Sequence, residues 1–282
     1  MAYWQCANNP LLWERRKPRS SYPIKPRSNG GFIDPSFAAH AAPTKKMLLY
    51  TPRLHLFRAT LRIPKRRQPM ATETVRGRTV TIHFDGERCI HSRNCVLSHP
   101  DVFVPNVVGE WIHPDAVAPE EVALIARNCP SGAIRYEYND GTHSEPAPVA
   151  NLVHIRENGP LAFTAPLLIA GKDEGMRATL CRCGESHNKP FCDHRHVECG
   201  FIATGEPAER KSEALPHRDG PLQVNPTRNG PLHVIGNLEV VSGTGRTIDR
   251  LSETWLCRCG HSNNKPFCDG SHKKVGFQAD GE

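Results

Sequence analysis

The chain has 282 residues, a formal net charge of +7 and 11 cysteines. A chain of this length forms two or three small domains, and domains that small often need metal sites or other cross-links for stability. Its longest apolar stretch, residues 161–170, is interrupted by Pro166 and falls well short of the roughly 20 residues of a membrane-spanning helix. The opening residues also lack the pattern of a secretory signal. We therefore expect a soluble, intracellular protein without a membrane segment.

Residues 1–70 form a basic, proline-rich leader with 14 lysines and arginines against two acidic residues, whereas the rest of the chain has 22 basic and 27 acidic residues. The absence of hydrophobic periodicity predicts a disordered segment, or a start codon assigned too early with Met70 as the natural first residue. An organelle transit peptide and a nucleic-acid-binding tail are the alternatives. Because the positive charge is confined to the leader, we do not expect the rest of the chain to bind nucleic acid.

Residues 71–142 are predicted to form a small α+β domain. Residues 76–84 alternate well enough for one strand. Residues 119–128 are predicted to be a short helix, because Pro119 and two glutamates suit a first turn. Residues 133–138 then return as a strand.

A stretch of 16 residues occurs twice, at 181–196 and 257–272, with 12 identical positions. The shared Asn-Gly-Pro-Leu sequence at 158–161 and 229–232 extends the duplication upstream. We predict two units, 150–203 and 221–282, joined by a linker at 204–220. Each unit is expected to contain a strand, a return strand, a ligand loop and a closing strand. An alternating apolar face predicts a half-buried hairpin in the second unit, formed by Leu232, Val234, Leu238 and Val240.

The repeat keeps three cysteines and one histidine in fixed register: Cys181, Cys183, Cys192 and His196 in the first copy, and Cys257, Cys259, Cys268 and His272 in the second. Three thiolates and one imidazole suit an iron–sulfur cluster or zinc. Lys189, Lys265, Arg182 and Arg258 lie close to these ligands in sequence, either as charges that tune the sites or as solvated loop residues. Two cysteines belong to no cysteine motif: Cys6 lies in the leader, and Cys199 is expected to be a small buried side chain.

The repeated stretch resembles the CDGSH iron–sulfur motif of the mitoNEET family, whose pattern is Cys-x-Cys-x2-Ser/Thr-x3-Pro-x-Cys-Asp-Gly-Ser/Ala/Thr-His. The second copy matches every position, whereas the first has His194 and Arg195 in place of the glycine and the small residue. The resemblance implies a [2Fe–2S] cluster on the three cysteines and the histidine of each copy. We expect His196 to be the ligand and His194 to be a loop residue.

Three further cysteines, Cys89, Cys95 and Cys129 followed by Pro130, resemble a bacterial single-cluster ferredoxin, in which Cys-x2-Cys-x2-Cys pairs with a distant Cys-Pro. Ser92 occupies the place of the missing second cysteine. Three thiolates predict a [3Fe–4S] cluster, or a [4Fe–4S] cluster whose last iron takes a non-cysteine ligand. His91 is adjacent and is either that ligand or a surface residue. Three ordinary buried cysteines are the alternative.

The expected fold class is α+β: a small ferredoxin-like domain followed by two β-rich CDGSH units, which have thin cores and should pack as an intramolecular pseudo-dimer behind a disordered leader. The expected function is one-electron transfer with two [2Fe–2S] clusters and one [3Fe–4S] or [4Fe–4S] cluster. Replacing a thiolate by neutral imidazole makes a site less negative and its reduction easier. Because a protonated imidazole cannot bind iron, a cluster donor or store, or a redox and pH sensor, is the alternative. A zinc-stapled interaction module is the third.

No nucleophile with a base, phosphate-binding glycine loop or paired carboxylate site is evident, so we do not expect an enzyme. The expected partner is a reductase or another oxidoreductase, or an apo-protein that accepts clusters. We expect a monomer in the cytoplasm, or in an organelle matrix if residues 1–69 are a transit peptide.

Overall fold

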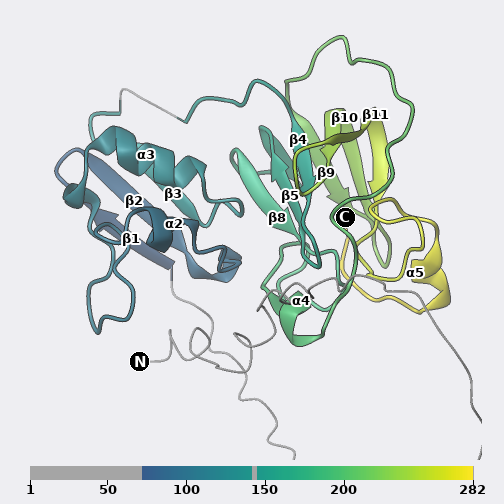
Figure 1. The fold of residues 1–282 in the computed structure, drawn as a ribbon, viewed down its shortest axis with the longest axis horizontal. Helices are drawn as coiled ribbons and strands as arrows, with labels where there is room; N and C mark the ends of the chain where they lie inside the picture. The colour runs from purple at the N-terminus through teal and green to yellow at the C-terminus, as the bar shows by residue number, and fades with distance from the viewer. Residues whose placement is uncertain (1–71, 142–144, 282) are drawn as a thin grey trace, which may run out of the picture. The chain divides into compact units, whose positions relative to one another are not determined.

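The computed structural model describes residues 72–141 and 145–281 (Figure 1). They form a mixed, sheet-rich structure with few and short helices, arranged in a three-stranded and an eight-stranded sheet. The leader predicted for residues 1–70 lies outside the described residues. Across the two described ranges, no helix has both the length and the apolar character needed to cross a bilayer.

The three-stranded sheet contains β1 (Thr72–Arg76), β2 (Val80–Asp85) and β3 (Ile134–Tyr138), all antiparallel and in that order. The strand predicted over residues 76–84 is confirmed from Val80 onward as β2, but its predicted first residues belong to the end of β1 and to the turn that follows it. The chain reverses at Gly77, whose amide donates to the Val80 carbonyl at 2.9 Å, and this turn makes a hairpin of β1 and β2.

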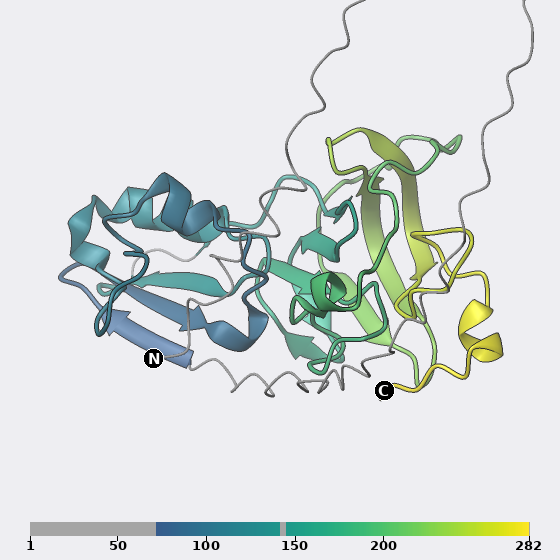
Figure 2. The ribbon, with the colours of Figure 1, turned by 60° about the horizontal axis from the view of Figure 1, so that its bottom comes forward.

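The predicted helix and the strand after it are confirmed as α3 (Pro119–Arg127) and β3. Helix α3 covers one face of the three-stranded sheet (Figure 2). It buries Val122, Ala123, Ile125 and Ala126, so the apolar stripe of the helix and the inner face of the sheet form one core. Three short elements lie between β2 and α3: η1 (Gly86–Arg88), α2 (Asn94–Ser98) and η2 (Pro114–Ala116).

Both repeats contribute strands to the eight-stranded sheet. The first supplies β4 (Leu152–Ile155), β5 (Leu161–Thr164), β6 (Leu167–Ile169), β7 (Lys172–Asp173) and β8 (Arg177–Leu180). The second supplies β9 (Leu222–Pro226), β10 (Leu232–Val241) and β11 (Thr247–Leu256). The order is β7-β6-β9-β10-β4-β5-β8, and β11 also pairs with β10. Each repeat ends in a ligand loop followed by a short helix, α4 (Arg195–Glu198) or α5 (Ser271–Lys274).

The two repeats exchange strand pairings. Strand β6 of the first lies parallel to β9 of the second, starting with Leu167 opposite Leu222. Strand β4 of the first lies parallel to β10, where Leu152 faces Glu239. One apolar core therefore runs through both repeats, from Val153 to Phe267, and neither repeat closes its core alone.

The predicted alternating face in β10 is confirmed: Leu232, Val234, Leu238 and Val240 are all at most 1% exposed. A bulge between Ile235 and Leu238 interrupts the pairing with β11 while these side chains still face the core. Gly236 (φ +124) allows this, because a Cβ there would lie 2.7 Å from the Pro221 carbonyl oxygen.

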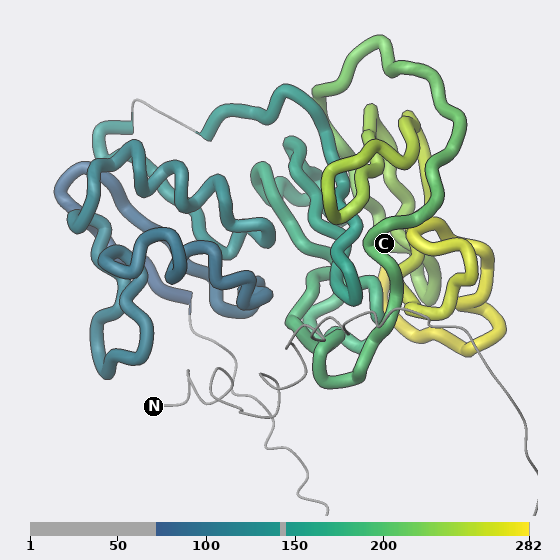
Figure 3. Tube along the Cα trace, in the orientation of Figure 1, coloured from purple at the N-terminus to yellow at the C-terminus, as the bar shows by residue number. Residues whose placement is uncertain are grey.

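Residues 204–220 contain no helix or strand, as expected of the linker, and are seen as a long irregular excursion of the trace (Figure 3). The predicted closing strands are wrong, because the described residues contain no strand between α4 and the linker at 204–220 and none after α5. An asparagine holds each closing segment instead. The side-chain oxygen of Asn158 accepts a hydrogen bond from the Ala203 amide, and the Asn158 amide donates to the Ala203 carbonyl, both at 2.9 Å. Asn229 makes the same two bonds with Ala279.

Candidate metal centres

The first ligand loop runs from the end of β8 to α4. The Cys181 amide donates to the Pro190 carbonyl at 2.8 Å, and the Cys192 amide donates to the Thr179 carbonyl at 2.9 Å. The loop therefore folds back on the strand that leads into it, and α4 then carries His196. Cys181 Sγ lies 3.7 Å from Cys183 Sγ, and Cys192 Sγ lies 3.4 Å from His196 Nδ1. All four predicted ligands of the first copy are thus close together.

The second ligand loop repeats this geometry. Cys257 Sγ lies 3.7 Å from Cys259 Sγ, and Cys268 Sγ lies 3.3 Å from His272 Nδ1. In each loop the candidate ligands form a Cys–Cys pair and a Cys–His pair. Across residues 72–141 and 145–281, no three histidine, cysteine or acidic side chains are grouped so that they could hold one metal ion. The four candidate donors of each loop therefore lie as two pairs.

A serine and an aspartate in each loop explain the spacing of the repeated sequence. In the second loop, Ser262 Oγ donates to the Phe267 carbonyl at 2.6 Å and accepts from the Asn264 amide at 3.0 Å. The Asp269 carboxylate accepts from the Asn263 and Ser271 amides at 2.8 and 2.9 Å. Ser186 and Asp193 make the same contacts in the first loop. These bonds fix the loop that carries the third cysteine and the start of the helix that carries the histidine.

The thiols of each Cys–Cys pair share one proton unequally. A hydrogen bond from Cys183 lowers the pKa of Cys181 to about 6 against the opposing effect of burial. The same bond and burial raise the pKa of Cys183. In the second loop, a hydrogen bond from Cys259 lowers the pKa of Cys257 to about 5. One sulfur of each pair is therefore favoured as a thiolate, the form that binds metal.

Burial favours the neutral form of both members of the Cys–His pair in the first loop, the protonated thiol of Cys192 and the unprotonated ring of His196. Burial raises the pKa of Cys192 to about 12. Burial also lowers the pKa of His196, which keeps the ring neutral at neutral pH. A neutral imidazole with Nδ1 directed at Cys192 Sγ is the protonation state that a metal requires.

Arg182 and Arg258 are buried, each 1% exposed, so the solvated-loop alternative is wrong for these two residues. Arg182 donates to the carbonyls of Arg156, Gly159, Ala203 and Thr204. Arg258 donates to those of Thr227, Gly230 and Asp280. None of these acceptors is a carboxylate. Each guanidinium ties a closing segment to the Asn-Gly-Pro turn and keeps its positive charge inside the protein.

The two ligand loops meet at their first halves. The backbones of Cys183 and Cys259 form an isolated antiparallel bridge. Each arginine is also attracted to a cysteine of the opposite loop: Arg182 to Cys257, and Arg258 to Cys181. The two candidate centres are therefore neighbours that share buried positive charge.

The three upstream cysteines lie at one edge of the smaller core. Cys89 follows η1, Cys95 lies in α2 and Cys129 directly follows the C-cap of α3. Cys129 is buried, and the other two pack against the same cluster. Burial raises the pKa of Cys89 to about 12 and that of Cys95 to about 11, and the charge of Cys129 contributes to both shifts. The structure thus brings these three predicted residues into one environment.

His91 and Ser92 lie in the turn between Cys89 and Cys95, and both are exposed. His91 has a positive φ of 53°, and its Nδ1 lies 3.9 Å from Cys89 Sγ. The expectation that Cys199 is buried is wrong: its side chain is exposed, and its Sγ contacts the His196 carbonyl at 3.7 Å. Cys6 lies outside the described residues.

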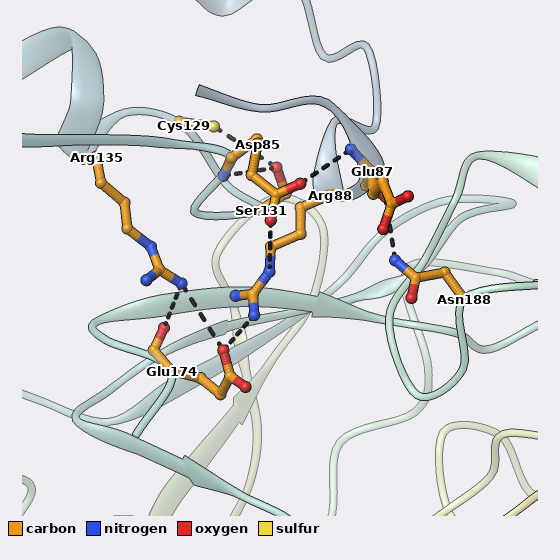
Figure 4. A network of polar contacts seen from close by, with 9 residues as sticks. Asp85, Glu87, Arg88, Cys129, Ser131, Arg135, Glu174 and Asn188 are labelled. Carbon is orange, nitrogen blue, oxygen red and sulfur yellow. Dashed lines mark hydrogen bonds and ion pairs between the residues drawn. The ribbon is translucent and has the colours of Figure 1, made fainter. Parts of the chain in front are cut away.

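A polar network that the sequence did not signal joins the upstream domain to the first repeat (Figure 4). Arg88 forms an ion pair with Glu174, and Arg135 donates to the Glu174 carbonyl at 3.2 Å. Asn188 of the first ligand loop donates to the Glu87 carbonyl at 3.3 Å. These contacts hold the first ligand loop next to the segment that leads into Cys89.

Comparison with known proteins gives matches in all three regions. Residues 158–197 and 229–273 each match the family described as "Iron-binding zinc finger CDGSH type". Residues 75–139 match "Divergent 4Fe-4S mono-cluster". The uncharacterized protein YjdI of Escherichia coli K12 is 35% identical over 63 residues, which are 22% of this chain and 80% of YjdI. YjdI of E. coli O157:H7 matches to the same extent.

The matched CDGSH segments contain the two Cys–Cys and Cys–His loops, and the matched mono-cluster segment contains Cys89, Cys95 and Cys129. Sequence matches and the arrangement of thiols and imidazoles thus agree on iron–sulfur chemistry. The chain belongs to the CDGSH iron–sulfur proteins, with two CDGSH segments joined to a divergent 4Fe-4S mono-cluster domain.

Proposed function

We propose that this iron–sulfur protein is a one-electron carrier with a [2Fe–2S] cluster in each CDGSH loop and a third cluster at the upstream cysteines. The pairing of donors carries the proposal: a Cys–Cys pair at 3.7 Å and a Cys–His pair at 3.4 or 3.3 Å in each loop. Each of two irons would receive two protein ligands. A [2Fe–2S] cluster supplies a one-electron couple, and an imidazole ligand raises its potential relative to an all-cysteine site.

The donor set fits this group better than structural zinc. A structural zinc ion takes four ligands around one atom. In the described part of the chain, the cysteines and histidines are instead paired, and no three of them are grouped for one ion. The buried arginines provide a second argument. A site with two metal atoms, sulfide and three thiolates is anionic, and Arg182 and Arg258 bring buried positive charge whose hydrogen bonds go to backbone carbonyls.

The protein would hold the two CDGSH loops as an internal pseudo-dimer. The parallel pairings β6 with β9 and β4 with β10 support this, because they are equivalent contacts made in the two directions. The bridge between Cys183 and Cys259 lies between the equivalent loops. This pairing leaves each ligand histidine, His196 and His272, half-buried at the far end of its loop from the bridge.

The third site would hold a [4Fe–4S] cluster, with a [3Fe–4S] cluster as the alternative. Cys89, Cys95 and Cys129 would bind three irons, and the mono-cluster match supports the four-iron form. His91 is the candidate for the remaining iron, because its Nδ1 lies 3.9 Å from Cys89 Sγ. A Ser92→Cys variant tests the site. It should convert a histidine-ligated or three-iron cluster into an all-cysteine [4Fe–4S] cluster with a changed electron paramagnetic resonance (EPR) signal.

The proposal is tested on the whole chain purified without oxygen. Iron, acid-labile sulfide and zinc are counted per chain, and redox titration is followed by absorbance and EPR. We expect a coloured protein with three reversible one-electron couples and equal iron and sulfide at the CDGSH sites. A colourless protein with zinc and no sulfide would refute the carrier and support a zinc-stapled module.

A cluster donor, or a redox and pH sensor, is the second candidate function. It is favoured by the partial exposure of the candidate ligands His196 and His272 to solvent. Transfer of iron and sulfide to an apo-ferredoxin is the discriminating measurement. A carrier keeps its clusters in the presence of the acceptor. A donor loses them, and His196→Cys or His272→Cys slows the loss.

The remaining expectations are part of the proposal. The protein would have no substrate of its own and would act as a monomer in the cytoplasm. Its partner would be a reductase or another oxidoreductase for a carrier, and an apo-acceptor for a donor. The acidic balance outside the leader, 22 basic against 27 acidic residues, argues against nucleic acid as a partner of the cluster-binding part.

A further inference from the structure

The first CDGSH loop differs from the second where backbone strain matters. Gly270 of the second loop has φ +84, a left-handed conformation that glycine adopts without steric cost. His194 occupies the equivalent position and has φ +70, although the same conformation is unfavourable for a residue with a side chain. The first loop therefore keeps a strained histidine where the second keeps a glycine.

The His194 ring connects two sites that the sequence separates by about 100 residues. On one side its centroid lies 4.9 Å from that of the candidate ligand His196, with the rings at 79°. On the other side it lies 5.5 Å from the His91 ring, at 78°. His91 in turn places Nδ1 3.9 Å from Cys89 Sγ. Three imidazoles thus form a continuous series from a cysteine of the third site to a ligand of the first CDGSH site.

Other contacts hold the same two segments together without involving histidine. Arg88 pairs with Glu174 and lies 4.3 Å from the centroid of the Phe191 ring in the first ligand loop. Asn188 donates to the Glu87 carbonyl (Figure 4). The apposition of the two segments therefore does not depend on the imidazoles alone. Removing one imidazole should therefore interrupt the series of rings without separating the two segments.

We propose that the His91 and His194 rings provide the direct path for electrons between the third site and the first CDGSH site. The inference rests on the proposed carrier function and adds a route to it. One electron leaves the site at Cys89 and the same electron arrives at the site of His196, or the reverse. No bond forms or breaks and no proton is required. The second CDGSH loop has Gly270 at this position and therefore lacks the corresponding ring.

The test uses the complete holoprotein and two variants. His194→Gly restores the residue of the second loop and relieves the strain, so it is expected to fold. His91→Ala removes the other ring, and because His91 is also the candidate ligand of the third site, its rate is compared only after iron and sulfide counts show that this site keeps its cluster. The protein is reduced with less than one electron per chain, frozen at successive times and examined by EPR, which distinguishes the sites. We expect equilibration between the third and first sites to slow at least about tenfold in both variants, equivalent to about 1.4 kcal/mol in activation free energy.

Two controls separate the rings from the interface. His187→Ala removes an exposed imidazole from the same loop, and Asn188→Ala removes an interface hydrogen bond without touching the three rings. Both should keep the wild-type rate. Magnetic broadening between the two reduced sites reports their separation, and it should persist in His194→Gly.

Three results of these measurements would overturn the inference. It fails if His194→Gly keeps its clusters and the wild-type rate, or if Asn188→Ala slows the transfer equally. It also fails if the broadening disappears with the rate, because His194 then only holds the interface. A wild-type protein whose sites cannot be reduced reversibly is recognised before any variant is made, and that result refutes the carrier function itself.

Discussion

The backbone of Cys183 pairs with the backbone of Cys259, so the two ligand loops of one chain meet as antiparallel partners. The glycine after each cysteine makes this approach feasible. A Cβ on Gly184 would lie 2.6 Å from the Cys259 carbonyl oxygen, and a Cβ on Gly260 would lie 2.4 Å from that of Cys183. Both glycines also have a positive φ, of 89° and 83°.

Gly260→Ala should therefore destabilise both ligand loops. The substitution combines backbone strain with a backbone clash, and we expect the free energy of unfolding to fall by about 2–3 kcal/mol. Chemical denaturation and the iron content per chain measure the effect. Gly276→Ala is the matched control, because Gly276 has φ +63 but a Cβ there meets no atom within 4 Å. An equal loss in both variants would show that strain alone acts and that the loops do not need close contact.

Arg258→Met should lower the reduction potential of the first CDGSH site, which lies in the opposite loop. Reduction adds negative charge, and the variant removes a buried cation that is attracted to Cys181. Redox titration of the first site, followed by EPR, measures the change. The variant also leaves the Thr227, Gly230 and Asp280 carbonyls without their donor, so the free energy of unfolding should fall by roughly 2–4 kcal/mol.

Arg258→Lys serves as the control for Arg258→Met. It keeps the charge but cannot reproduce the planar set of donors. Its potential should stay near that of the wild type while its stability falls. A potential that drops equally in both variants would assign the effect to altered loop geometry.

The wild-type protein should lose the cluster of its first loop in acid more readily than the His196→Cys variant does. Burial lowers the pKa of His196 below its ordinary value of 6.5. The neutral ring is therefore favoured in the folded protein, and the contribution of this group to stability falls as the pH drops below the ordinary pKa. The decay of visible absorbance between pH 7 and pH 5 measures this. Identical decay in the variant would show that acid acts elsewhere.

Cys129→Ala should remove the third cluster and leave both CDGSH clusters in place. Cys129 is 8% exposed and packs in the smaller core, which contains no residue of the CDGSH loops. Iron and sulfide counts and the EPR spectrum of the reduced protein measure the loss. Cys199→Ala is the control, since Cys199 is exposed and should not change either count. Loss of all three clusters in Cys129→Ala would mean that the sites depend on one another for assembly.

The local elements that the sequence predicted correctly have strong short-range signals. Pro119 and two glutamates marked the start of α3, and apolar residues at alternating positions marked the buried face of β10. The strand over residues 76–84 was predicted to start too early, because the turn at Gly77 lies inside an apparently continuous pattern. The closing strands were wrong because a side chain and a buried arginine hold these segments, and neither leaves a periodic pattern in the sequence.

The candidate ligands were predictable from sequence because donor atoms that share a metal site must recur at fixed spacing, and the duplication displayed that spacing twice. Their grouping into pairs was not predictable, because the distance between Cys192 and His196 depends on how the chain folds back between Pro190 and α4. The burial of Arg182 and Arg258 was likewise not predictable, because their hydrogen-bond acceptors are backbone carbonyls, which every residue has.

The chemistry of this protein can be deduced from its residues alone: which atoms are candidate iron ligands, how many candidate sites there are and that the two copies are unequal at His194. Which of these sites are neighbours becomes evident only from the folded chain. Strand pairing between the repeats brings Cys183 to Cys259, and the network around Glu174 brings His91 to His194. Ligand identity is a local property of side chains, whereas the apposition of sites depends on contacts between residues far apart in the chain.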